Sequence, residues 1–525
     1  MRLGPAIRNL NSGRGRRWAA RLALPALLAL GVSGLAPPAI AAGSSQPFIV
    51  ATSAEPDSID ITRGIFPPVN YVSLRNIYEA LWGYANDGKV KQTVATWTVS
   101  PDHKVITFHL KHGIHFQSGD ELTASDVVFG YDRLVKLTHP FMRHAKFIQS
   151  VKALNKYTVQ IVFKRPDVTF FNGVSLFPAD KAYHDRVGEK YFQDHPDGIG
   201  PYKFVQYKRG QYMDMEAWPG YYGKQPQIKH VRFMFVKDNQ TRVAMLEAGD
   251  ADMIMDAPFT EVAKLKSEGF NVVKLPANPT VSIEFDMLNT KAPWHDIRVR
   301  EAIAHAVDAG AIIKGLFEGV PDRYPRLAPG EAGFDPTLKN YTYNPKLAKK
   351  LLAEAGYPHG FTMPLYYTGG FFYGFRQTTE AVVLYLKQVG IICDVHELEG
   401  PKGFSFVANV AKHPNIPYVS ISGMPIANSG LPSLEALYLS FYPSSPFVLY
   451  HYPEIINGIN QAQSELDPVK RADDIKRMNK FLYDQYASIT LWDGMSVFAM
   501  KKNVHYQPIE HRMPFLVMEN VHVTK

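Results

Sequence analysis

The sequence of 525 residues has almost no cysteine. Cys393 is the one cysteine, so the chain cannot form an internal disulfide. It lies in the apolar stretch GIICDV, where the expected state is a buried and unreactive thiol.

Motifs of common hydrolases and nucleotide-binding proteins are also absent. The sequence has no Gly-x-Ser-x-Gly, no His-Glu-x-x-His and no Gly-x-x-x-x-Gly-Lys-Ser/Thr. His109, His112 and His115 have the spacing of a metal site on a helix, but the segment reads as a strand that continues through Gly113. We therefore expect neither a metal site nor a cofactor, and a protein that is not an enzyme.

A charge excess of one sign is lacking outside the first 41 residues. That segment holds six of the 57 basic residues and no acidic residue. The remaining 51 basic residues face 49 acidic ones, a net charge of +2. A nearly neutral chain lacks the positive surface that nucleic-acid binding requires. We therefore expect no nucleic-acid partner.

Residues 1–41 have the three parts of a secretory signal. Basic residues end at Arg21, an apolar run covers Leu22–Ala36, and small residues follow at Ala39–Ala41. The run is shorter than the roughly 20 residues that span a bilayer, and Pro25 interrupts it. The pattern predicts a cleavable signal peptide over residues 1–41.

The same segment indicates where the protein acts. Arg16 and Arg17 precede the apolar run, which leaves twin-arginine export open beside the general secretory route. No cysteine lies near the expected cleavage site, so the protein is not expected to be a lipoprotein. We expect a soluble periplasmic protein.

Helical and strand patterns alternate along the rest of the chain. NPKLAKKLLAEAG predicts a helix between Asn344 and Gly356, and DNQTRVAMLEAG predicts one between Asp238 and Gly249. Gly249 leads directly into ADMIM, and Gly390 leads into IICDV, both typical of strands. The order helix, glycine, strand favours an α/β fold.

Gly198 and Gly200, in the stretch DGIGPYKFVQYKRGQ, could form either a phosphate-binding loop or a turn. A phosphate-binding loop must open a helix whose N–H groups meet the anion. Pro201 removes an N–H, and the following residues alternate as in a β-hairpin that turns at Lys208–Gly210. We therefore interpret the glycines as the tight start of a strand.

Several ordered motifs carry a family resemblance. The longest are GIGPYKFVQYKRGQYMDMEAWPGYYGKQPQIKHVRFMFVKDNQTRVAMLEAGDADM and NIYEALWGYANDGKV followed by VATWTVSPDHKVITFHLKHGIHFQSGDELTASDVVFGYDRL. PDSIDI, LNTKAPWHDIRVREAIAHAVD and DPVKRADDIKRMNKFLYDQYASITLW occur at their expected places. Together they resemble the family 5 extracellular solute-binding proteins, the peptide and nickel class of ABC importer receptors. The resemblance covers almost the whole mature chain.

This resemblance implies a two-lobed α/β periplasmic binding protein with an extra domain, whose lobes are joined by a hinge around a central ligand cleft. The implied divisions are the signal peptide at 1–41, lobe I at 46–78, 197–286 and 491–525, the extra domain at 79–196, and lobe II at 287–490.

The implied function is that of a periplasmic substrate-binding receptor of an ABC importer. It would bind a peptide or peptide-like solute between its lobes and deliver it to a permease in the inner membrane. The receptor is expected to be a monomer. A second hypothesis gives the same receptor a sugar, an opine, a metal chelate or another amphipathic small molecule. A third is an exported enzyme or chaperone-like protein that reuses the fold.

One position separates the first two hypotheses. Peptide receptors of this family hold the ligand's ammonium group with an aspartate four residues before a proline. Counting back four from Pro432 gives Asn428, and no acidic residue lies between Tyr418 and Leu434. An amide accepts a hydrogen bond but lacks the charge that strengthens an ammonium contact. Asn428 therefore counts against ordinary peptide binding.

Aromatic residues are frequent where the resemblance places the cleft. The stretch LYYTGGFFYGFR supplies flat apolar side chains and one cation, and either a pocket wall or a packed core would use them. The candidate ligand-binding residues, with Asn428, are Phe66, Tyr366, Tyr367, Phe372, Arg376 and Trp492.

Overall fold

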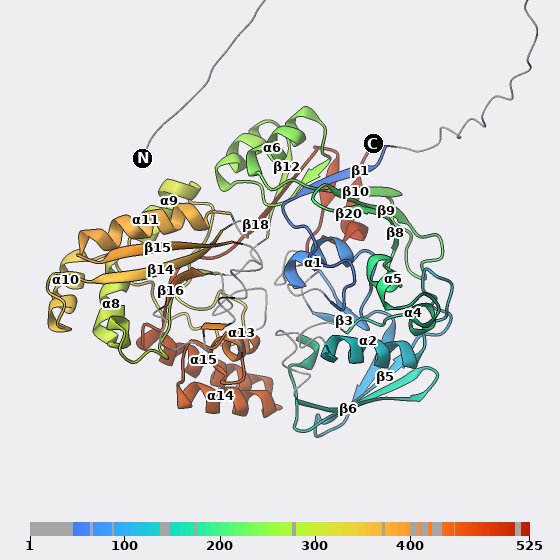
Figure 1. The fold of residues 1–525 in the computed structure, drawn as a ribbon, viewed down its shortest axis with the longest axis horizontal. Helices are drawn as coiled ribbons and strands as arrows, with labels where there is room; N and C mark the ends of the chain where they lie inside the picture. The colour runs from blue at the N-terminus through green and yellow to red at the C-terminus, as the bar shows by residue number, and fades with distance from the viewer. Residues whose placement is uncertain are drawn as a thin grey trace, which may run out of the picture. The chain divides into compact units, whose positions relative to one another are not determined.

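In the computed structural model, residues 46–525 form one compact unit that contains three larger β-sheets (Figure 1). The structure describes residues 46–63, 67–86, 89–136, 147–172, 176–275, 280–369, 373–399, 406, 409–410, 418–422, 433–445, 447–509 and 516–525. The predicted signal peptide and its cleavage site lie outside these ranges. Within them, no helix combines the length and the apolar character that crossing a bilayer requires.

The seven-stranded sheet gathers segments from both ends of the chain. Its order is β12-β18-β11-β1-β10-β9-β8. Parallel pairing of β1 with β10 and β11 forms its centre, and the remaining pairs are antiparallel. The strands are β1 (Phe48–Thr52), β8 (Tyr202–Lys208), β9 (Tyr212–Ala217), β10 (His230–Phe235), β11 (Met253–Ile254), β12 (Asn271–Leu275) and β18 (Ser496–Met500).

The five-stranded sheet lies between two groups of helices. Its order is β15-β14-β16-β13-β17, with β14, β15 and β16 parallel to one another. One apolar core joins the sheet to α8, α9, α10 and α11, and a second core holds α13, α14 and α15 together. The strands are β13 (Val281–Phe285), β14 (Thr362–Gly369), β15 (Ile392–Glu399), β16 (Val419–Ser422) and β17 (Ser488–Trp492).

A four-stranded antiparallel sheet occupies the stretch between β1 and β8. Its order is β4-β5-β7-β6, and its core includes Val127 of α2. The strands are β4 (Ala95–Val99), β5 (Val105–Leu110), β6 (Ile148–Asn155) and β7 (Thr158–Phe163). Two short pairs complete the sheets: β2 (Trp82–Tyr84) with β3 (Val90–Gln92), and β19 (Val504–Tyr506) with β20 (Val521–Val523).

The described helices are distributed among these three parts. They are α1 (Pro67–Leu74), α2 (Ala124–Lys136), α4 (Lys181–Val187), α5 (Glu189–Asp194), α6 (Asn239–Ala248), α7 (Val262–Ser267), α8 (Ile297–Ala306), α9 (Ala309–Phe317), α10 (Pro345–Glu354), α11 (Phe375–Gln388), α13 (Ser433–Phe441), α14 (Pro453–Ser464) and α15 (Pro468–Asp484). Short 3₁₀ turns are η1 (Phe170–Asn172), η2 (Phe259–Glu261), η3 (Pro293–His295) and η4 (Met518–Asn520).

The predicted helix boundaries are confirmed because they depend on local chemistry. The side chain of Asn344 accepts a hydrogen bond from the N–H of Leu347 at the start of α10, and Asp238 accepts one from Thr241 at the start of α6. Gly249 ends α6 with φ at 83°, a left-handed conformation that glycine adopts without strain. The strand expected after it is β11.

The interpretation of Gly198 and Gly200 is also confirmed. The N–H of Gly200 donates to the carbonyl oxygen of Ile77 at 2.8 Å, and a Cβ on Gly198 would lie 2.1 Å from that same oxygen. The two glycines let one backbone approach another, and the chain then enters the β8–β9 hairpin. No helix begins there that could bind a phosphate through its N–H groups.

In the described part of the chain, two crossings connect the seven-stranded and five-stranded sheets. The first runs from β12 to β13, between Leu275 and Val281, and the second runs from β17 to β18, between Trp492 and Ser496. The chain therefore passes between the two large α/β parts only at these two short segments within the described residues. This connectivity is that of a two-lobed α/β binding protein.

Candidate functional site

Along the chain, parallel strands of both large sheets precede residues that the sequence singled out. In α/β sheets, ligands bind beyond the carboxyl ends of such strands. Strand β14 ends at Gly369, three residues before Phe372, and β16 ends at Ser422, six residues before Asn428. Phe66 follows β1 in the other sheet. Phe66, Phe372 and Asn428 themselves lie outside the described residues.

Aromatic rings from η2, α9 and α11 pack around Trp492 of β17, beside the second crossing. Its ring centroid lies 5.1 Å from that of Phe317 in α9 and 5.9 Å from that of Phe259 in η2. Its indole N–H donates to Thr378 Oγ1 of α11 at 3.0 Å, and only 2% of the residue is exposed. Phe259 follows β11 of the seven-stranded sheet, so this aromatic cluster joins both sheets.

Asp493 links the two crossings to each other. Its Oδ1 accepts a hydrogen bond from Thr280 Oγ1 of the first crossing at 3.1 Å. Its Oδ2 accepts from the N–H of Tyr324 at 2.7 Å, while its own N–H donates to the carbonyl oxygen of Asp322 at 2.8 Å. Burial raises the pKa of Asp493 to about 7, because the charged carboxylate loses its water shell there.

Tyr366 and Tyr367 lie on opposite faces of the five-stranded sheet, since side chains alternate along a strand. Tyr366 stacks on Tyr418 and Phe406 at centroid distances of 5.2 Å, and on His396 at 4.8 Å. Tyr367 belongs instead to the core that contains Trp492. The structure therefore separates the two tyrosines rather than placing both in one pocket wall.

Arg376 starts α11 and is ion-paired. Its Nη2 lies 2.6 Å from Glu397 of β15, and its guanidinium lies 6.0 Å from the ring centroid of Tyr367. The side chain is 60% exposed, so solvent weakens this pair. A ligand carboxylate or phosphate that binds Arg376 has to compete with Glu397.

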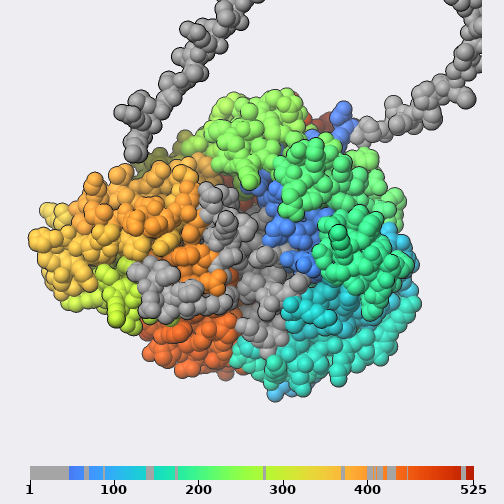
Figure 2. Space-filling view, viewed as in Figure 1, coloured from blue at the N-terminus to red at the C-terminus, as the bar shows by residue number. Residues whose placement is uncertain are grey.

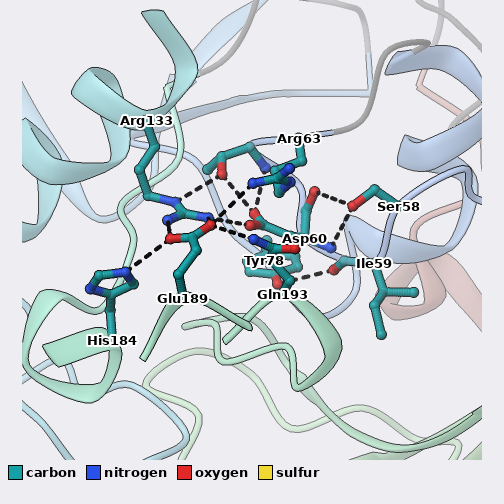
Figure 3. A network of polar contacts seen from close by, with 10 residues as sticks. Ser58, Ile59, Asp60, Arg63, Tyr78, Arg133, His184, Glu189 and Gln193 are labelled. Atoms are coloured by element: carbon teal, nitrogen blue, oxygen red, sulfur yellow. Dashed lines mark hydrogen bonds and ion pairs between the residues drawn. The ribbon is translucent and has the colours of Figure 1, made fainter. Parts of the chain in front are cut away.

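A buried ion-pair network attaches the first loop to the four-stranded part (Figure 3). Arg133 of α2 donates to Asp60 and to Glu189, each at 2.5 Å. Burial opposes the charge of Arg133, but its bonds to Glu189 and Asp60 outweigh that cost, so its pKa is raised. The same bond to Arg133 lowers the pKa of Glu189 to about 2. Asp60 belongs to the PDSIDI motif, so the motif has a structural use.

Sequence reasoning missed the partners that complete the crossings. Phe259 follows the carboxyl end of β11, and this position after a strand could have identified it as a candidate site residue. Asp493 directly follows Trp492, but its bond to Thr280 joins residues 213 positions apart. Only tertiary structure brings them together.

The cysteine and two of the histidines that the sequence singled out have the following surroundings. Cys393 is partly buried, and burial raises the pKa of its thiol to about 12, so it is a poor nucleophile. His112 stacks on Tyr157, and His115 bonds to the carbonyl oxygen of Gly113. The described residues hold no group of three or more His, Cys, Asp or Glu that could ligate a metal ion.

Comparison with known families defines the class. Residues 90–440 match the model described as bacterial extracellular solute-binding proteins, family 5 middle. The chain belongs to the family 5 bacterial extracellular solute-binding proteins, as its two-lobed connectivity and its motifs indicated.

A curated relative and two solved structures extend this comparison. The glutathione-binding protein GsiB of Shigella boydii serotype 4 (strain Sb227) is 29% identical over 337 residues, and the alignment spans 62% of this chain and 64% of the relative's length. The periplasmic binding protein DppA from Helicobacter pylori, in complex with the peptide STSA, is 20% identical with a TM-score of 0.78, covering 91% of this chain and 98% of the other. The binding protein AgaA from A.tumefacien R10, in complex with agropinic acid, is 25% identical with a TM-score of 0.75, covering 91% and 99%.

Proposed function

We propose that this protein is the periplasmic substrate-binding receptor of an ABC importer. It binds a peptide or peptide-like solute between its lobes and delivers it to a membrane permease, without catalysing a reaction. The observation that carries the proposal is the pair of crossings linked by the Asp493–Thr280 hydrogen bond beside the Trp492 cluster. Two lobes joined in this way can close as nearly rigid bodies around a solute.

The proposed lobe I comprises residues 46–78, 197–286 and 491–525, the extra domain 79–196, and lobe II 287–490. Strand β13 falls within those lobe I bounds but pairs within the five-stranded sheet, which favours a first crossing at residues 276–280 and the assignment of 281–286 to lobe II. The proposed mature protein is a monomer that begins after residue 41.

The proposed ligand-binding residues combine described and undescribed parts of the chain. Tyr366 lies in β14, Arg376 lies near the start of α11, and Trp492 lies at the second crossing. The ring of Tyr367 packs beneath Arg376. Phe66, Phe372 and Asn428 are placed there by sequence alone. Aromatic walls with few polar groups suit an amphipathic solute.

Native mass spectrometry of protein purified from its own periplasm tests the proposal. The expected result is a bound mass that is released on denaturation and identified as a short peptide or a related compound. Protein that carries no solute and is not stabilised by reduced glutathione, by dipeptides or by agropinic acid in a thermal-shift assay would contradict it.

A second candidate is the same receptor role for a non-peptide solute such as an opine. Asn428 favours it, because the position that resembles the peptide-anchoring aspartate carries no charge. The 25% identity to the agropinic acid complex points the same way.

The variant Asn428→Asp separates these two candidates. If the missing charge excludes peptides, Asn428→Asp gains affinity for a dipeptide in calorimetry and loses affinity for agropinic acid. The exposed Asn457→Asp on α14 is the matched control and should bind as the wild type does. Identical affinities of Asn428→Asp and the wild type would show that Asn428 is not a ligand-binding residue.

A further inference from the structure

A polar contact joins the four-stranded part to α14 of the five-stranded part. Arg165 lies two residues after β7. Its Nη1 donates to Asn460 Oδ1 at 2.9 Å, and its Nη2 donates to Gln463 Oε1 at 2.5 Å. Asn460 and Gln463 are three residues apart on α14 and therefore share one side of the helix. The two amide oxygens together match the fork of one guanidinium.

The surrounding residues hold Arg165 in this position. Its guanidinium carbon lies 3.9 Å from the ring centroid of Phe147, a cation–π distance. The N–H of Val168 is 3.5 Å from the carbonyl oxygen of Gln463, so the backbones also approach each other. On the other side, Tyr442 donates to Asn460 Oδ1 at 3.0 Å and fixes the direction of the acceptor.

The connectivity gives this contact its significance. The four-stranded part is inserted between β1 and β8 of the seven-stranded sheet, and α14 belongs to the stretch between the two crossings. Arg165 and α14 are therefore connected through the crossings at Leu275–Val281 and Trp492–Ser496. Figure 1 shows β6 and α14 at the bottom of the drawing and β18 higher up. On the face drawn in Figure 2, orange-red residues meet cyan ones along the lower edge.

The chemistry of the contact permits it to open. Both acceptors are neutral amide oxygens, so water can replace them when the guanidinium leaves. A buried carboxylate partner would instead be left as an uncompensated charge. Arg165 is only partly buried, which lowers the cost of returning it to solvent. A charge-assisted pair of bonds still favours the joined state over the separated one.

We propose that Arg165 is a positioning residue that holds the lobes closed around the bound solute, with Asn460 and Gln463 as its acceptors. The inference rests on the proposed receptor function. The contact must break before the crossings can bend and the solute can leave. Its loss therefore speeds solute release and leaves the folded lobes intact.

Distances between spin labels test the closure without any solute. Lys152→Cys and Lys470→Cys place exposed labels on the two sides in a Cys393→Ala background, where they are the only thiols. We expect Arg165→Ala to raise the share of long distances by about fivefold, since the net contribution of one partly exposed hydrogen-bonded contact shifts a two-state population by about this factor. Arg209→Ala, which removes a cation above the Tyr207 ring without touching α14, should match the background protein. Identical distance distributions for Arg165→Ala and the background would overturn the proposal.

Dissociation kinetics distinguish this inference from the receptor proposal. With reduced glutathione as the probe, Arg165→Ala should release the probe about fivefold faster with an unchanged association rate, as expected for a contact formed after encounter. Asn460→Ala should act in the same direction, and the double variant should add little to either single change. A wild type that does not bind glutathione removes that solute from the receptor proposal, while the distance measurement still decides the role of Arg165. Equal release rates in a wild type that binds would overturn the inference.

Discussion

The two regions that join the large parts of this molecule differ in their chemistry. Around the crossings, Trp492 packs against Phe259 and Phe317, and the hydrogen bond from Thr280 to Asp493 is buried. At α14, the contact is mainly polar: the partly exposed Arg165 binds two neutral amides, beside an edge contact of the Phe147 ring with Tyr438.

The difference indicates which region bends and which one separates. Apolar packing at the crossings has no replacement partner in water, so those residues stay together while backbone angles change. Hydrogen bonds to amides exchange with water at little cost. The crossings therefore act as the pivot, and the Arg165 contact is the part that opens.

The largest effect is expected at the pivot. Trp492→Ala removes a fully buried indole and should lower the free energy of unfolding by about 3–5 kcal/mol. Urea denaturation measures it, with the exposed Tyr191→Ala as a control that should cost less than about 1 kcal/mol. A loss below about 1 kcal/mol for Trp492→Ala would show that the aromatic cluster does not hold the crossings.

The buried network around Arg133 should have the next largest effect, because it attaches the four-stranded part that carries Arg165. Arg133→Ala leaves the buried carboxylate of Asp60 without its cation and should cost about 3 kcal/mol. Arg186→Ala breaks an exposed pair with Asp120 in the same part and should cost far less. Equal losses in denaturation would contradict the assigned difference in burial.

A smaller effect is expected from the pH dependence of the pivot. The folded pKa of Asp493 is raised from 3.8 to about 7, so its contribution to stability is fully present below pH 3.8 and is lost as the pH rises through 7. When the pH is raised from 5 to 8, the free energy of unfolding should fall by about 2 kcal/mol less in Asp493→Asn than in the wild type. Asp102→Asn should follow the wild-type profile there, since hydrogen bonds from Ser100 and Lys104 lower its pKa below that window. Parallel profiles for Asp493→Asn and the wild type would refute the assignment.

Local features of the fold were predictable from the sequence, and distant pairings were not. The caps of α6 and α10 involve residues a few positions apart, so the sequence predicts both helices. Strand β13 was assigned with the residues before it, but it pairs with β16 and β17, more than 130 residues further along the chain.

The candidate site shows the same limit. The sequence marked Trp492 as a ligand contact, and its burial among Phe259 and Phe317 depends on elements that meet only in the folded chain. No sequence motif marks Arg165 as a contact residue. Its acceptors on α14 are almost 300 residues away, so only the folded chain brings them together.

Small-angle X-ray scattering on protein freed of its solute tests the central claim most directly. The protein is unfolded in guanidinium, refolded without solute, measured, and measured again after adding back the material that it released. The account predicts a reversible decrease in the radius of gyration on reloading, because closure about the two crossings brings the lobes together. An unchanged radius in the presence of demonstrated binding would contradict a receptor that closes around its solute.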